Sequence, residues 1–86
     1  DPSAKAWLGY VASKQGDWEE ARRQFAASAS VIDGFPPEWR ARFGCAHALA
    51  ALELGDVEAA RSLLAYALSQ PIGAAEQLQI RLVQAR

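Results

Sequence analysis

The residues best suited to covalent or metal chemistry in this sequence are Cys45 and His47, which stand two positions apart. A thiol and an imidazole within hydrogen-bond reach would make a nucleophile and its base. On a helix, however, side chains two residues apart point about 200° away from each other. No third ligand stands at the spacing of a metal site, and no carboxylate is placed to orient the imidazole. We therefore expect no enzyme active site, no metal and no cofactor, and we expect His47 to be a packed, neutral side chain.

Aromatic and acidic side chains suggest two other kinds of site. Trp7, Trp18 and Trp39 could form a stacking surface for sugar rings, but Trp18 and Trp39 fall on apolar stripes of helical spacing and are expected to be buried. Trp7 is then the remaining candidate for a sugar contact. Glu19 and Glu20 fall in the first turn of a predicted helix, where carboxylates offset the positive end of the helix dipole without any acid–base role.

An internal repeat organises the chain that must position these residues. The segment GDWEEARRQF, residues 16–25, is matched 39 positions later by GDVEAARSLL, residues 55–64. The same shift places Arg42 on Arg81, so the end of the chain begins a third copy. A fixed period of this length is typical of arrays in which each unit buries its apolar face against its neighbours. We expect a piece of a longer array.

Turn and capping residues divide the repeat into helices. Gly16 and Gly55 supply closing residues, and Asp17 and Asp56 follow them as caps of the next helix. Asp1 is expected to cap the first helix, and Pro and Gly residues separate the others. The fold class is all-α, and the five predicted helices cover 2–15, 18–32, 37–54, 57–69 and 74–86. Because the connections at the two glycines are short, we expect antiparallel hairpins over 2–32 and 37–69, followed by an unpaired helix over 74–86.

The pattern resembles the tetratricopeptide repeat (TPR). The residues that carry the resemblance are Leu8-Gly9, Gly16-Asp17, Ala21, Phe25 and Ser28 in the first unit, and Ala48, Gly55, Ala60, Leu64 and Ala67 in the second. The resemblance covers almost all of residues 1–86 and implies hairpins stacked as an α-solenoid. The usual repeat has about 34 residues, so each unit here carries about five more. His47 also stands where the family prefers Leu, and Ala12 and Ala51 where it prefers Tyr.

The resemblance implies a concave groove lined by the first helix of each hairpin. The side chains it assigns to that groove are Tyr10, Ser13 and Lys14 with Ser3 and Ala6 in the first unit, Arg42, Cys45, Leu49 and Glu53 with Leu52 in the second, and Arg81 with Gln84 in the third. Arg42 and Arg81, aligned on one wall, could hold a carboxylate or a backbone carbonyl of an extended partner. The alternative is that these are simply solvated positions.

Three functions follow as expectations. The first is a non-catalytic scaffold that binds a protein or peptide in the groove. The second comes from a resemblance to the periplasmic portions of bacterial exopolysaccharide export proteins, in which such arrays dock enzymes or guide polymer. The third is a homo-oligomer formed through the apolar residues of the last helix, which are Leu78, Leu82 and Val83.

Composition narrows the partners further. The net charge of −1 and the pI near 5.7 argue against a nucleic-acid footprint, which needs clustered Lys and Arg. No run approaches the roughly 20 apolar residues of a membrane span. The excess of Arg over Lys suggests a bacterial genome rich in GC, and the sequence leaves cytoplasm and periplasm both open.

Overall fold

The chain is all-helical in the computed structural model, which describes residues 2–85. Its elements are α1 (Pro2–Lys14), α2 (Trp18–Ala27), the 3-10 helix η1 (Ala29–Gly34), α3 (Pro37–Glu53), α4 (Val57–Leu68) and α5 (Ala74–Gln84). This confirms the predicted all-α class. The expected cap Asp1 and the expected last helical residue, Arg86, lie outside the described residues.

Each of the five α-helices begins at or within a residue of the position that the capping residues predicted. Gly16 and Gly55 have φ angles of +77° and +86°, in the left-handed region that favours glycine. Asp17 and Asp56 then accept hydrogen bonds from the backbone N–H three residues on, at 3.4 and 3.1 Å. The repeated Gly-Asp pair therefore closes one helix and opens the next in both hairpins.

The prediction of one α-helix over 18–32 was wrong. The α-helix ends at Ala27, and η1 follows after Ser28. The Ser28 hydroxyl donates to the Phe25 carbonyl at 3.0 Å, which gives that carbonyl a partner other than the next helical amide. β-Branched Val31 and Ile32 come next and are weak helix formers. The other helices end one or two residues before the predicted positions, within the usual fraying of helix ends.

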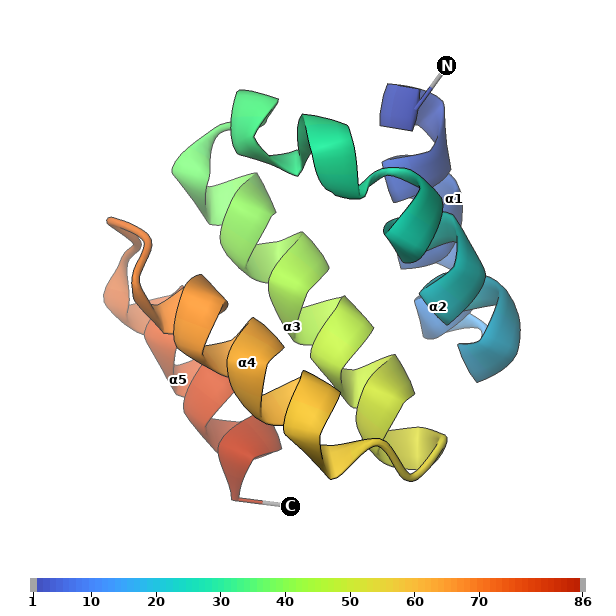
Figure 1. The fold of residues 1–86 in the computed structure, drawn as a ribbon. Coiled ribbons are helices and arrows are strands. Elements are labelled where there is room, and N and C mark those ends of the chain that lie inside the picture. The colour runs from blue at the N-terminus through green and yellow to red at the C-terminus, as the bar shows by residue number, and fades with distance from the viewer. Residues whose placement is uncertain (1, 86) are drawn as a thin grey trace.

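The helices pack as two pairs and a fifth member. α1 packs against α2, α3 packs against α4, and α3 lies between the two pairs, where it also contacts α1, α2 and α5 (Figure 1). α1, α3 and α5 run in the same general direction and touch in sequence, α1 to α3 and α3 to α5. We call these three helices the first-helix row.

Two apolar clusters fill the space between helices, and α3 contributes to both. One contains Ala6, Ala12, Ala21, Phe25, Phe43 and Ala50, and the other contains Ala41, Cys45, Ala48, Ala51, Ala60, Leu64, Ala67, Ile80 and Val83. Most members are alanines, so the helices approach closely and few large side chains separate them. Phe43 is the largest fully buried side chain, and it lies within 6.1 Å, ring centre to ring centre, of Phe25 and of four other aromatic rings.

Polar contacts join neighbouring helix pairs at the surface. Arg22 of α2 pairs with Asp56 at the start of α4, and the Tyr66 hydroxyl of α4 donates to Asp33 of η1 at 2.7 Å. Because exposed ion pairs contribute about 0–1 kcal/mol each, the Arg22–Asp56 pair orients the helix pairs more than it stabilises them.

Candidate functional site

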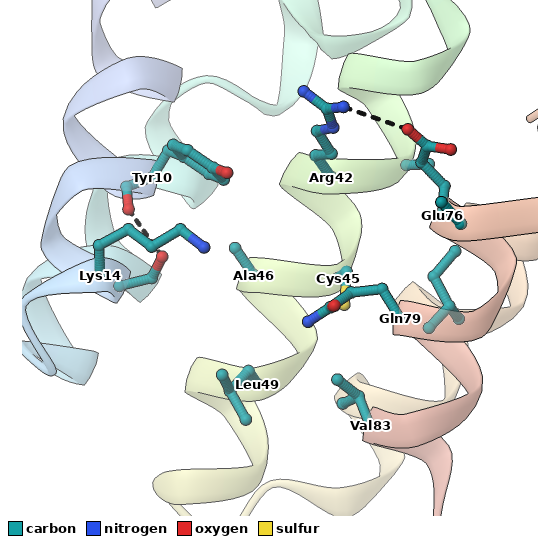
Figure 2. Close-up of a pocket in the computed structure, with 13 residues that line it drawn as sticks. Tyr10, Lys14, Arg42, Cys45, Ala46, Leu49, Glu76, Gln79 and Val83 are labelled. Carbon is teal, nitrogen blue, oxygen red and sulfur yellow. Dashed lines mark hydrogen bonds and ion pairs between the residues drawn. The ribbon is translucent and has the colours of Figure 1, made fainter. Parts of the chain in front are cut away.

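A groove of about 330 Å³ runs across the first-helix row (Figure 2). Its lining comes from α1 with Tyr10, Ser13 and Lys14, from α3 with Ala41, Arg42, Cys45, Ala46 and Leu49, and from α5 with Ala75, Glu76, Gln79, Ile80 and Val83. No residue of α2 or α4 lines it. The groove thus lies on the face where α1, α3 and α5 meet side by side.

The structure places six of the residues expected in a groove along its wall or floor: Tyr10, Ser13, Lys14, Arg42, Cys45 and Leu49. Glu53 and Arg81 do not line it. Ala6, also expected to point into a groove, is fully buried in the core. The groove residues of α5, above all Glu76 and Gln79, were not expected from the sequence.

The 39-residue register explains why Glu53 and Arg81 fall elsewhere. The Gly-Asp motifs are 39 residues apart, but the residues that line the groove are not. Lys14 of α1 and Leu49 of α3 line it 35 residues apart, so Leu49 and not Glu53 takes the place that corresponds to Lys14. Arg42 of α3 and Gln79 of α5 line it 37 residues apart. A step of 37 brings Gln79, not Arg81, to the place of Arg42, and two residues of helix turn Arg81 about 200° away from it.

The floor of the groove is apolar and its walls carry polar groups. Ala46, Cys45, Leu49 and Val83 form the floor. Figure 2 shows the Lys14 side chain reaching toward the centre from α1 and the Gln79 amide reaching toward it from α5. Two hydrogen-bond donors therefore face each other across an apolar strip.

Arg42 closes one end of the groove. Its guanidinium is 3.1 Å from the Glu76 carboxylate and lies 4.7 Å from the centre of the Trp39 ring. The two guanidiniums expected on one wall are thus replaced by an ion pair between α3 and α5. An arginine held by a carboxylate and an aromatic face has little freedom to reorient.

The lining of the groove has a net positive charge, and Lys14 supplies it. Because Arg42 and Glu76 offset each other, the third charged residue of the lining sets the sign. The Lys14 ammonium lies 5.1 Å from the centre of the Tyr10 ring. It also opposes part of the effect of burial on Cys45, whose pKa is raised by desolvation and lowered in smaller measure by Lys14. The thiol is therefore a neutral part of the floor at pH 7.

His47 lies on a different side of α3 from Cys45. Its ring stacks on Phe25 with centres 5.2 Å apart and planes 20° apart. Burial first, and then the positive charge of Arg22, lower the pKa of His47. The imidazole is thus neutral and packed between helices, while the thiol faces the groove, so the two do not form a nucleophile–base pair.

Trp7 belongs to the aromatic cluster and does not line the groove. It is 40% exposed, and its ring meets those of Phe35, Trp39 and Phe43 edge-on at 5.9, 4.7 and 5.0 Å. One part of the ring therefore remains open to solvent while the rest packs.

The apolar face expected on the last helix is smaller than predicted. Leu78 and Leu82 are 60% and 57% exposed, but Val83 is 6% exposed and packs into the core cluster beneath the groove. Because Val83 faces the core, it takes no part in an exposed face.

No family model, curated protein or solved structure matches the chain. Within residues 2–85, no group of three or more His, Cys, Asp and Glu side chains could hold a metal ion. None of the helices described there combines the length and apolar character needed to cross a bilayer.

Proposed function

We propose that this chain is a TPR-like segment of an α-solenoid scaffold and that it binds an extended segment of a protein partner in the groove, without catalysis. The observation that carries the proposal is the apolar floor flanked by Lys14 and Gln79, which reach in from opposite helices (Figure 2). A groove built across three successive helices is a continuous surface, as a solenoid would provide.

An extended peptide fits this surface chemically. Its backbone carbonyls need donors once water is displaced, and Lys14 and Gln79 supply them from both walls. Its apolar side chains would rest on Leu49, Ala46 and Val83. A volume of about 330 Å³ is at the lower end of the range for ligand pockets, which suits two or three side chains of a peptide.

Charge selects among peptides. With Arg42 and Glu76 paired, Lys14 gives the lining a net charge of +1, so acidic or neutral segments are favoured over basic ones. This preference weakens as salt rises, because Lys14 is exposed.

The test is a selection of displayed random peptides against the immobilised protein, followed by calorimetric measurement of the affinities of the binders. Gln79→Trp should fill the groove and weaken binding at least tenfold. Gln77→Trp is the matched control, because Gln77 is the same residue type, exposed, on the same helix, and outside the lining. Binders that tolerate Gln79→Trp as well as Gln77→Trp would refute the groove as their site.

Charge reversal provides a second comparison. Lys14→Glu should weaken acidic peptides and strengthen basic ones, whereas Lys5→Glu, on the same helix but outside the lining, should leave both unchanged. Equal changes of affinity in the two variants would mean that peptide binding depends only on the overall charge of the protein. A selection that yields no binder at all would count against the proposal.

A further inference from the structure

The contacts within the first-helix row repeat one pattern. α3 and α5 each use two apolar residues three apart to pack against the preceding helix of the row. In α3 these are Phe43 and Ala46, which pack with the cluster formed by α1 and α2. In α5 they are Ile80 and Val83, which are buried in the cluster formed by α3 and α4.

Each contact is completed by two residues four apart on the preceding helix. In α1 these are Ala6 and Tyr10, and the Tyr10 ring centre lies 5.9 Å from that of Phe43. In α3 they are Ala41 and Cys45, which share a buried cluster with the residues of α5. In α3 this pair begins two residues before the pair that faces backward, so the helix has a backward face and a forward face.

One backward face and one forward face are exposed to solvent, and they lie at opposite ends of the first-helix row. Leu8 and Val11 are the backward face of α1, 35 residues before Phe43 and Ala46, and are 54% and 51% exposed. Leu78 and Leu82 are the forward face of α5, 37 residues after Ala41 and Cys45, and are 60% and 57% exposed. The chain thus exposes both halves of a contact that it makes twice internally.

We propose that a second copy of this chain completes that contact, with Leu8 and Val11 of one copy packing on Leu78 and Leu82 of the next. All four residues are aliphatic, so neither face brings a charge into the contact. The α1-to-α3 and α3-to-α5 contacts join helices that run the same way, and a head-to-tail arrangement preserves that geometry. A symmetric pairing of two α5 helices would bring two forward faces together, whereas each contact in the row joins a forward face to a backward face.

A head-to-tail contact joins two unlike faces, so each added copy leaves one further face exposed unless the rotation between copies closes the assembly into a ring. Association should therefore extend beyond a dimer as concentration rises. It also carries the first-helix row across the junction between copies. The inference does not depend on the groove binding a peptide, because neither face contributes to the groove lining.

The test is solution mass by light scattering or sedimentation over a hundredfold range of concentration. The wild-type mass should rise above the 9.3 kDa of one chain without levelling at a dimer. Leu8→Asp and Leu82→Asp should each be monomeric, because each loses one face. An equimolar mixture of the two should form a species of twice the monomer mass and nothing larger, because one intact face of each kind remains.

The matched control is Val57→Asp, which places the same charge at an apolar residue of α4 that is 48% exposed and lies on neither face. It should associate as the wild type does. Circular dichroism checks that all three variants fold, as expected for positions that are about half exposed. A Leu8→Asp variant that still dimerises, a mixture that stays monomeric, or a wild-type protein that is monomeric throughout would each overturn the inference.

Discussion

Two glycines in helix interiors should respond with opposite signs to the same substitution. Gly9 lies in α1 and Gly44 in α3. Where nothing crowds the new methyl group, Gly→Ala in a helix interior stabilises the fold by roughly 0.5–1 kcal/mol, because glycine loses more backbone freedom on folding than alanine does. The space that the new methyl group would enter decides whether that gain is kept.

At Gly9 the methyl group has no room. A Cβ there would lie 3.0–3.1 Å from three carbons of the Phe25 ring. Phe25 is 2% exposed and stacked on His47, so its ring has nowhere to move without displacing others. Overpacking a core costs about 1–3 kcal/mol, which exceeds the helix gain. We expect Gly9→Ala to destabilise the fold by roughly 1 kcal/mol.

At Gly44 the methyl group fits. The nearest atoms would be the Ala67 Cβ at 3.4 Å, the Leu63 carbonyl oxygen at 3.5 Å and a Tyr66 ring carbon at 3.6 Å, all ordinary contacts. We expect Gly44→Ala to stabilise the fold by roughly 0.5–1 kcal/mol. The two variants should then differ by about 2 kcal/mol, or roughly 8–16 °C in Tm for a chain of this size.

Urea and thermal unfolding of both variants, followed by circular dichroism, measure this difference. The double variant Gly9→Ala with Phe25→Leu identifies the cause, because removing the ring should make the added methyl group less harmful than it is in the wild-type background. If Gly9→Ala raises Tm as Gly44→Ala does, or if the double variant shows no coupling, the account of close packing between α1 and α2 is wrong.

Two further predictions concern pH. The backbone N–H of Ala59 and the Arg22 side chain hold the pKa of Asp56 below its ordinary value of 3.8, so the stability that Asp56 contributes is present above that pH and is lost as pH falls below it. Asp56→Asn should flatten the acid limb of a stability–pH curve more than Asp17→Asn does, and equal curves would contradict this. Burial, followed by the hydrogen bond to Asp33, raises the pKa of Tyr66 to about 12, so its contribution is complete below pH 10 and lost as pH rises through 12. Phenolate absorbance should show a step near pH 12 that Tyr66→Phe removes, and a step that persists in that variant would belong to another group.

The sequence was sufficient wherever a local motif sets the structure. The Gly-Asp pairs fix where one helix ends and the next begins, because a left-handed glycine and an aspartate cap act within a few residues. The groove residues of α1 could also be named, because the resemblance to the tetratricopeptide repeat assigns Tyr10, Ser13 and Lys14 to a groove, and all three line the one observed.

The sequence was insufficient where packing between helices decides. The end of α2 depends on Ser28 and on the tie between η1 and Tyr66, which no periodicity reveals. The groove side of α5 depends on how α5 packs on α3, and the motif repeat has a step of 39 where the groove residues Arg42 and Gln79 are 37 apart. Because of that difference of two residues, the sequence register named Arg81 where the groove has Gln79. Val83, which was expected on the exposed face of the last helix, is buried in the core.

The central place of α3 has a consequence for how the chain opens. Both apolar clusters need α3: Phe43 and Ala50 complete one, and Ala48 and Ala51 belong to the other. Detaching α1 or α5 dismantles one cluster, whereas detaching α3 dismantles both. Amide hydrogens of α3 should therefore exchange with solvent only when the whole chain unfolds, while those of the outer helices exchange through partial openings. The outer helices at the two ends of the row then open independently of each other, whereas α3 opens only when the whole chain unfolds.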